Sequence, residues 1–174
     1  ICNAGMRSRI SIQDASIETY RQVFETNTLS QINIIQHLVS SKKSQSKTLS
    51  ILVISSIVGQ RGFVDLSTYG VSKAALEGFV KSASVELADK NVLINSLNPG
   101  FAKSSYETAF RSNKKELYEW TLAQTPMKRW AECHEIANLA LFLVSPNNTY
   151  MTGSLVYCDG GWTAKWLKAL IVLA

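Results

Sequence analysis

Three short apolar segments constrain the fold of this chain more than any other feature. Residues 49–54, 92–97 and 154–158 have the composition of buried strands, and long stretches of helical periodicity separate them. Strands joined through a helix pair in parallel, because a parallel pair requires a crossover of a dozen or more residues. The sequence therefore predicts an α/β fold, and its 174 residues suit one domain with a sizeable core.

Three helices are expected, one before the first of these strands and one between each pair of consecutive strands. Apolar residues recur at intervals of three and four over residues 16–39, 68–88 and 131–144. Residues 103–130 are polar and aromatic without a clear period, and they include Tyr106 and Trp130. Such a stretch in a compact domain is either a lid over a site or an exposed pair of helices.

A candidate active site begins at Tyr69 and Lys73. These residues are four apart on a predicted helix, so the phenol and the ammonium share one face. A neighbouring cation favours the phenolate, and we expect Lys73 to lower the pKa of Tyr69 toward neutrality, which would suit a general acid or base. Ser55 and Ser56 follow the strand 49–54, at the end of a parallel strand where ligands bind. A lone Tyr-x-x-x-Lys also occurs by chance on exposed helices.

Six short motifs occur in a fixed order along the chain. They are Asn3-Ala4-Gly5, Asn27 within Glu25-Thr26-Asn27, Ser56, Tyr69 with Lys73, Asn98-Pro99-Gly100 and Asp159-Gly160-Gly161. In order and spacing they resemble the short-chain dehydrogenase/reductase family, classical type, and most closely the 3-oxoacyl-acyl-carrier-protein reductases. The resemblance covers residues 1–162. It implies the C-terminal portion of a Rossmann-like doubly wound parallel sheet with flanking helices, followed by a tail at 163–174 that we expect to pack or contact a subunit.

The resemblance also implies roles for individual residues. Ser56, which has the family's thirteen-residue separation from Tyr69, would bind the substrate oxygen, and Tyr69 would exchange the proton. Lys73 would lower the pKa of Tyr69 and hold the nicotinamide ribose, while Asn27 would kink its helix and hold a water. The expected catalytic residues are thus Asn27, Ser56, Tyr69 and Lys73. The expected cofactor contacts are Asn3, Ala4, Gly5, Tyr69, Lys73, Pro99, Gly100 and Ser104.

The glycine-rich phosphate turn of the family has no counterpart among the nine glycines, because none has the G-x-G-x-x-G spacing. That turn normally supplies backbone amides and a helix N-terminus to the pyrophosphate. We therefore expect the chain to be a partial domain that lacks the first βαβαβ half and needs an upstream segment for activity. The alternative is a truncated, non-catalytic member that acts only as a dimerising or partner-binding domain.

The bulk properties narrow the choice of partners. The formal charge of +5 comes from scattered basic residues without a nucleic-acid-binding motif, and no apolar run is long enough to span a membrane. Cys2, Cys133 and Cys158 are odd in number and lack metal or redox spacing, which favours a reducing cytoplasm and predicts no metal site. Cys2 and Cys158 are expected to be buried.

The function expected from this resemblance is hydride transfer between NAD or NADP and a carbonyl or secondary alcohol. The substrate would be a small molecule, with an acyl-carrier-bound 3-oxoacyl thioester as one candidate and a sugar, polyol or steroid as others. The helices 16–39 and 68–88 resemble the family's subunit interface, and the expected assembly is a homodimer or homotetramer.

Overall fold

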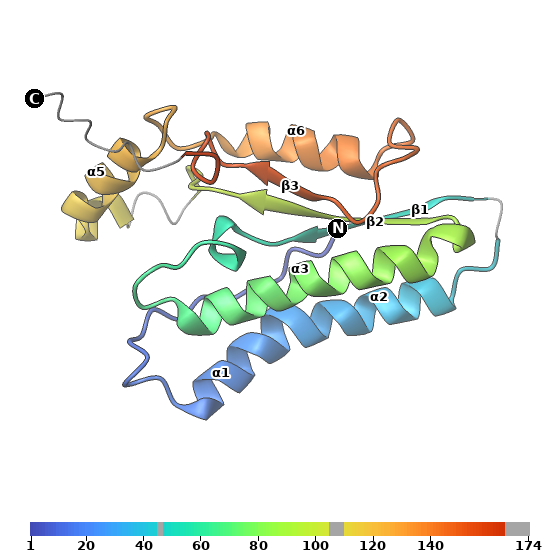
Figure 1. Cartoon of the computed structure of the whole chain (residues 1–174), viewed down its shortest axis with the longest axis horizontal. Coiled ribbons are helices and arrows are strands. Elements are labelled where there is room, and N and C mark those ends of the chain that lie inside the picture. The colour runs from blue at the N-terminus through green and yellow to red at the C-terminus, as the bar shows by residue number, and fades with distance from the viewer. Residues whose placement is uncertain (45–46, 105–109, 166–174) are drawn as a thin grey trace, which may run out of the picture.

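The computed structural model describes residues 1–44, 47–104 and 110–165, and it shows a parallel sheet between two layers of helices (Figure 1). The strands are β1 (Leu49–Ile54), β2 (Val92–Pro99) and β3 (Leu155–Cys158), in the order β1-β2-β3. The helices are α1 (Ile17–Phe24), α2 (Ser30–Ser40), α3 (Ser67–Leu87), α5 (Lys115–Gln124) and α6 (Cys133–Val144). Cys2 adds a single parallel bridge to Val53 beside β1.

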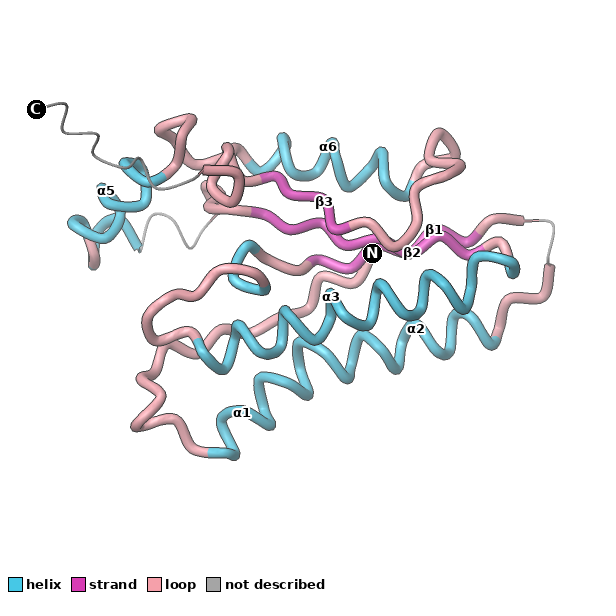
Figure 2. Tube along the Cα trace, viewed as in Figure 1, coloured by secondary structure: helices cyan, strands magenta, loops and turns pink. Residues whose placement is uncertain are grey.

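The alternation of side chains along β1 divides the core in two. Ile51 and Val53 face α2 and α3, where they pack in a cluster with Leu76 and Val80. Leu52 points to the opposite face, where its cluster includes Leu97 of β2 and Ala140 and Leu143 of α6. Successive residues of a strand point to opposite faces, so one apolar strand supplies both layers. Figure 2 shows the same arrangement, with α6 on one side of the strands and α2 and α3 on the other.

The helix predicted at 16–39 is present but is not a regular α-helix. Ser16 caps its first turn by accepting a hydrogen bond from the Thr19 amide at 3.1 Å. Between α1 and α2 the chain forms a π-helical turn, η1 (Glu25–Leu29), which contains Asn27. A π-turn inserts an extra residue into the helix, and here it lies where the expected kink was placed.

Two 3₁₀ turns complete the connections between these elements. The turn η2 (Ile57–Gly59) follows β1, and η3 (Ala88–Lys90) joins α3 to β2. The predicted closing turn is present after β3, where both carboxylate oxygens of Asp159 accept hydrogen bonds from Gly161 and Thr163. Gly160 and Gly161 have positive φ angles of 62° and 85°, which glycine adopts without strain.

The stretch 103–130 is partly helical and partly core. Trp130 is 1% exposed, and its indole Nε1 donates to the Thr121 hydroxyl of α5 at 2.8 Å. Its ring stacks on Phe101 with 5.1 Å between centroids. Residues 105–109, including Tyr106, lie outside the described residues, as does the tail from residue 166. In the described part of the chain, no helix combines the length and the apolar character that a membrane span requires.

Candidate active site

Ser56, Tyr69 and Lys73 lie together where β1 ends and α3 begins. Ser56 follows β1 directly, and its hydroxyl accepts a hydrogen bond from the Val58 amide at 3.2 Å. Tyr69 lies in the first turn of α3, and the Lys73 ammonium is 5.7 Å from the centroid of its ring. A side-chain hydrogen bond joins Ser56 to the Tyr69 phenol and by itself lowers the pKa of that phenol. The structure thus brings a hydroxyl, a phenol and an ammonium to one edge of the sheet.

Lys73 is a buried cation at 4% exposure. Its Nζ donates a hydrogen bond of 2.8 Å to the backbone carbonyl of Ile54, the last residue of β1. Burial disfavours the charged form of an amine, and it lowers the pKa of Lys73 to about 8. An ammonium has three N–H donors, and Ile54 is the acceptor of one of them.

The expected lowering of the Tyr69 pKa is wrong for these surroundings. The pKa of Tyr69 is raised, because burial of the phenol outweighs the two effects that lower it, the positive charge of Arg7 and hydrogen bonding to Ser56. Lys73 is not among the causes of the shift. Removal from water destabilises the phenolate more than Arg7 and Ser56 stabilise it, and Tyr69 is protonated at neutral pH.

Asn27 occupies the inside of the π-turn and is fully buried. Its Oδ1 accepts from the Met6 amide at 2.7 Å, while its Nδ2 donates to the Met6 carbonyl and to the Ser72 hydroxyl, both at 2.9 Å. Ser72 precedes Lys73 in α3. Asn27 therefore ties the segment that follows Gly5 to the helix that carries Tyr69 and Lys73.

Gly5 lies between Asn27 and Lys73. A Cβ atom at this glycine would be 3.5 Å from the Asn27 Oδ1 and 3.7 Å from the Lys73 Nζ. Both polar groups therefore border the space that a side chain would fill. Ala4 is fixed beside it, since its carbonyl accepts a hydrogen bond from the buried Gln31 at 2.7 Å.

The other residues expected to contact a cofactor lie at the same edge. Pro99 ends β2. Gly100 follows it and lies so close to the segment after β3 that a Cβ atom would be 2.8 Å from the Asp159 Cα. A hollow of about 190 Å³ opens here. It is lined by Arg7, Gly100, Phe101, Ala102, Ser104 and Trp130.

A buried carboxylate lies beneath the site and has no counterpart in the sequence prediction. Glu77, one turn after Lys73 in α3, is 5% exposed. Its Oε1 accepts hydrogen bonds from the Ser55 hydroxyl at 3.0 Å and from the side-chain Nδ2 of Asn98 at 2.5 Å. Burial raises the pKa of Glu77, and these two donors and the charge of Lys81 oppose that shift.

Glu77 therefore separates the roles of the two serines after β1. Ser55 binds the carboxylate behind the strand, and Ser56 faces Tyr69. The signal in the sequence was the acidic residue between Leu76 and Val80, on a helix face that is otherwise apolar. An acidic residue there requires buried donors, and the polar ends of β1 and β2 supply them.

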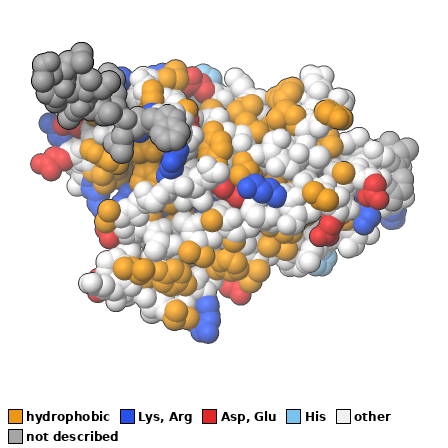
Figure 3. All heavy atoms as spheres, viewed as in Figure 1, with side chains coloured by type: hydrophobic (Ala, Val, Ile, Leu, Met, Phe, Trp, Pro, Cys, Tyr) orange, Lys and Arg blue, Asp and Glu red, His pale blue; other side chains and the backbone are white. Residues whose placement is uncertain are grey.

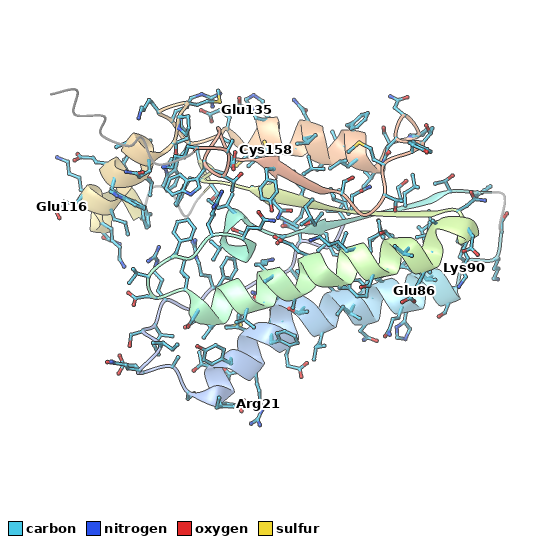
Figure 4. All side chains as sticks on the ribbon, viewed as in Figure 1. Arg21, Glu86, Lys90, Glu116, Glu135 and Cys158 are labelled. Atoms are coloured by element: carbon cyan, nitrogen blue, oxygen red, sulfur yellow. The ribbon has the colours of Figure 1, made fainter. Side chains whose placement is uncertain are left out.

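A second, smaller hollow of about 80 Å³ lies near the ends of α6 and β3. Arg129 and Glu135 form a two-point ion pair across it, with N–O distances of 2.6 and 2.7 Å. Figure 4 shows Glu135 at the start of α6, near Cys158 at the end of β3. Among the described residues, no cluster of three or more histidine, cysteine or acidic side chains is arranged to hold a metal ion.

Comparison with known proteins decides the family. The family described as enoyl-(acyl carrier protein) reductase matches residues 1–163. The chain belongs to the short-chain dehydrogenase/reductase family. This confirms the predicted family, and the parallel sheet with flanking helices confirms the predicted fold class. Short-chain dehydrogenases/reductases use NAD or NADP as the hydride carrier.

Two curated short-chain dehydrogenases/reductases illustrate the similarity. The chain is 32% identical over 162 residues to trans-4-hydroxycyclohexanecarboxylate dehydrogenase of Sinomonas cyclohexanicum, which covers 93% of the chain and 59% of that relative. It is 34% identical over 159 residues to the 3-oxoacyl-(acyl-carrier-protein) reductase FabG of Chlamydia trachomatis serovar D, with 91% and 62% covered. The chain thus spans about three fifths of the length of these relatives.

A solved structure supports the fold. ElxO with NADP bound superposes with a TM-score of 0.86 at 27% identity, over 94% of this chain and 66% of that one.

Proposed function

We propose that this protein transfers a hydride between NAD or NADP and a carbonyl or secondary alcohol. The observation that carries the proposal is the meeting of Ser56, Tyr69 and Lys73 at the carboxyl end of β1. Parallel α/β sheets bind their ligands at this edge. We also propose that residues 1–162 form the dehydrogenase part of the chain and that residues 163–174 form a tail.

The chain's own residues manage the substrate oxygen and its proton. The Ser56 hydroxyl and the Tyr69 phenol donate hydrogen bonds to that oxygen and stabilise the negative charge that develops on it. Tyr69 then delivers its proton, which an ordinary phenol already holds at neutral pH and which burial, by raising the pKa of Tyr69, holds more firmly. Protonated Tyr69 suits reduction of a carbonyl to an alcohol. The groups that stabilise the remaining phenolate are the positive charge of Arg7 and the hydrogen bond from Ser56, the two effects that lower the Tyr69 pKa.

The cofactor site in this proposal is formed by the residues around Gly5 and Gly100. The nicotinamide cofactor, when bound, supplies or accepts the hydride. Asn3, Ala4 and Gly5 form one side of its site, and Pro99, Gly100 and Ser104 form the other. Tyr69 and Lys73 hold the ribose between them, with the Lys73 N–H groups that do not bind Ile54 as donors. Asn27 would hold a water on the path of protons to Lys73 through the second lone pair of its Oδ1, because both Nδ2 hydrogens are donated to Met6 and Ser72.

Two substrate classes are suggested by the named relatives. One is a 3-oxoacyl thioester, as in the name of the reductase from Chlamydia, and the other is a hydroxy acid, as in the name of the dehydrogenase from Sinomonas. Both are consistent with a site that binds one carbonyl oxygen between Ser56 and Tyr69.

The assembly we propose is a homodimer or homotetramer. Hydrophobic side chains on α1, α2 and α3 are exposed: Ile17, Ile34, Leu38, Val71 and Val85. Figure 3 shows a band of hydrophobic side chains on the side of the molecule that α1, α2 and α3 form. A second copy would cover such a surface.

Free cysteines at 2, 133 and 158 suit the cytoplasm, where thiols stay reduced.

The test incubates the full protein with NADH or NADPH and a panel of ketones, oxo acids and 3-oxoacyl thioesters. Oxidation of the cofactor is measured as the loss of absorbance of its reduced form. We expect turnover with one cofactor, and we expect Ser56→Ala to lower kcat by about 100-fold because it removes one donor to the developing charge. Ser145→Ala, at the far end of α6, is the matched control and keeps wild-type turnover. Equal activity of the Ser56 variant would remove Ser56 from the mechanism.

A further inference from the structure

Three polar side chains form a row across the sheet beneath the candidate site. This polar row consists of Ser55, Asn98 and Tyr157, one from the end of each strand. Asn98 is in register with Tyr157. The Ser55 amide donates to the Leu97 carbonyl at 2.8 Å, which continues the β1–β2 register and places Ser55 beside Asn98. Residues in register point to the same face of a sheet. Ser56 follows the first member of the row directly.

One oxygen of the Glu77 carboxylate joins two members of the polar row. Its Oε1 accepts hydrogen bonds from the Ser55 hydroxyl at 3.0 Å and from the Asn98 Nδ2 at 2.5 Å. The Asn98 side chain is also fixed from its other side, because its Oδ1 accepts from the Ser96 hydroxyl at 2.7 Å. None of these four residues is more than 5% exposed. Buried and fully paired polar groups hold a single geometry, so α3 is cross-linked to the ends of β1 and β2.

The third member of the row lies within electrostatic range of the same carboxylate. The pKa of Tyr157 is raised to about 12, first by burial and then by the negative charges of Glu77 and Asp159, while Arg61 opposes the shift. The Tyr157 hydroxyl is buried, and it has no hydrogen-bond partner among the described residues. The charge of Glu77 therefore acts on side chains at the ends of all three strands.

Glu77 also contacts the chain on both sides of Ser56. Ser55 precedes it and binds the carboxylate. The turn that follows is built on Ser56 itself, whose hydroxyl accepts from the Val58 amide at 3.2 Å and whose carbonyl accepts from the Gly59 amide at 3.1 Å. This turn packs against the carboxylate, since a Cβ atom at Gly59 would be 2.3 Å from the Glu77 Oε1. The carboxylate therefore limits the movement of Ser56 in both directions.

We propose that Glu77 is a positioning residue, which holds the Ser56 hydroxyl beside the Tyr69 phenol without touching the substrate. This rests on the proposed function and deepens it, because it names a buried group that sets the rate through Ser56. Glu77 and Tyr69 belong to the same helix, α3. A carboxylate on that helix that binds the end of β1 fixes the distance between Ser56 and Tyr69. A displacement of about 1 Å at a reacting group can lower a rate by about 100-fold.

The experiment compares Glu77→Leu with Glu77→Gln in the full protein, at saturating cofactor and with the carbonyl compound that the wild type reduces fastest. In Glu77→Leu we expect kcat to fall by about 10- to 100-fold and KM to change by less than about threefold, because Ser56 acts on charge that develops after binding. Glu77→Gln keeps an oxygen acceptor and recovers at least about half of the wild-type kcat. Glu86→Leu, the same change at an exposed position near the end of α3, keeps the wild-type kcat and is the control.

A double-mutant cycle with Ser56→Ala separates positioning from a loss of folded protein. If Glu77 acts through Ser56, Glu77→Leu lowers kcat by less than about threefold once the Ser56 hydroxyl is absent. A change that only reduces the folded fraction lowers kcat by the same factor in both backgrounds, and that result would overturn the inference. A wild-type kcat in Glu77→Leu, or a glutamine variant as slow as the leucine variant, would overturn it as well.

Hydrogen exchange keeps this inference separate from the proposed function, because it needs no substrate. If no carbonyl compound is reduced, the proposed function fails, but exchange of the two amides that Ser56 binds can still be measured. Glu77→Leu raises the exchange rates of the Val58 and Gly59 amides at least about 10-fold more than that of the Gly153 amide, which is bonded near the start of β2. Equal acceleration of all three amides would refute the positioning role.

Discussion

Gly59 and the buried carboxylate of Glu77 provide the sharpest test of the packing beneath the site. A Cβ atom at Gly59 would be 2.3 Å from the Glu77 Oε1 and 2.9 Å from its Cδ. Glu77 is 5% exposed and its Oε1 is held by Ser55 and Asn98, so it has little room to move. The substitution Gly59→Ala should therefore displace the carboxylate from its two donors.

The magnitude follows from these contacts. The carboxylate must retreat by about 1 Å to reach an ordinary contact distance, which lengthens or breaks both hydrogen bonds. Hydrogen bonds to a charged group contribute about 1.5–3 kcal/mol each, and overpacking costs a similar amount. We expect a loss of about 3 kcal/mol in the free energy of unfolding. For a protein of this size that corresponds to a decrease in Tm of about 6–12 °C.

The assay is urea unfolding of the wild type, Gly59→Ala and a control, Gly62→Ala. A Cβ at Gly62 has no heavy atom within 4 Å, so this variant should be neutral or more stable by about 0.5 kcal/mol. The decisive comparison is a double-mutant cycle with Glu77→Ala. Once the carboxylate is gone, Gly59→Ala should cost less than about 1 kcal/mol. A full cost in that background would show that the contact with Glu77 is not the cause.

Three further predictions concern the buried polar groups. The pKa of Lys73 is about 8 in the folded protein and 10.5 as the ordinary value for lysine, so between these pH values the unfolded chain binds a proton that the folded protein does not. The free energy of unfolding should therefore rise by about 3 kcal/mol from pH 8 to 10.5. This rise should be missing from the pH profile of Lys73→Met. Thr121→Val should cost about 1–3 kcal/mol in urea unfolding, because it leaves the Trp130 N–H buried without its acceptor, and Thr121→Ser should restore most of the loss. Asn27→Ala should raise the hydrogen-exchange rate of the Met6 amide at least 10-fold by removing its acceptor, and unchanged exchange would mean that this bond does not hold the segment.

The fold was predictable because its signals are local. The apolar runs at 49–54 and 92–97 and the three- and four-residue spacing in 68–88 gave elements whose observed ends differ by only one or two residues. The π-turn at Asn27 could not be derived from periodicity, since the extra residue is stabilised by contacts with Met6 and Ser72, far away in the sequence. Only the family resemblance placed a kink there.

The site was predictable in position but not in its electrostatics. The spacing of Tyr69 and Lys73 correctly placed both side chains on one face. It could not give the raised pKa of Tyr69, because burial depends on the packing of the whole layer. Glu77 was missed for the same reason, since its donors Ser55 and Asn98 come from the ends of two strands that only the folded sheet brings together.

The central claim is that the Tyr69 phenol protonates the substrate oxygen beside Ser56 and Lys73. The most direct measurement is single-turnover transfer of deuterium from cofactor labelled at C4 to the carbonyl carbon of the substrate, in the wild type, in Tyr69→Phe and in the control Tyr118→Phe. The account predicts that Tyr69→Phe transfers the label at least about 100-fold more slowly while its Kd for the cofactor rises by no more than about tenfold, the effect of losing one hydrogen bond to the ribose. Label transfer at the wild-type rate in Tyr69→Phe would contradict it.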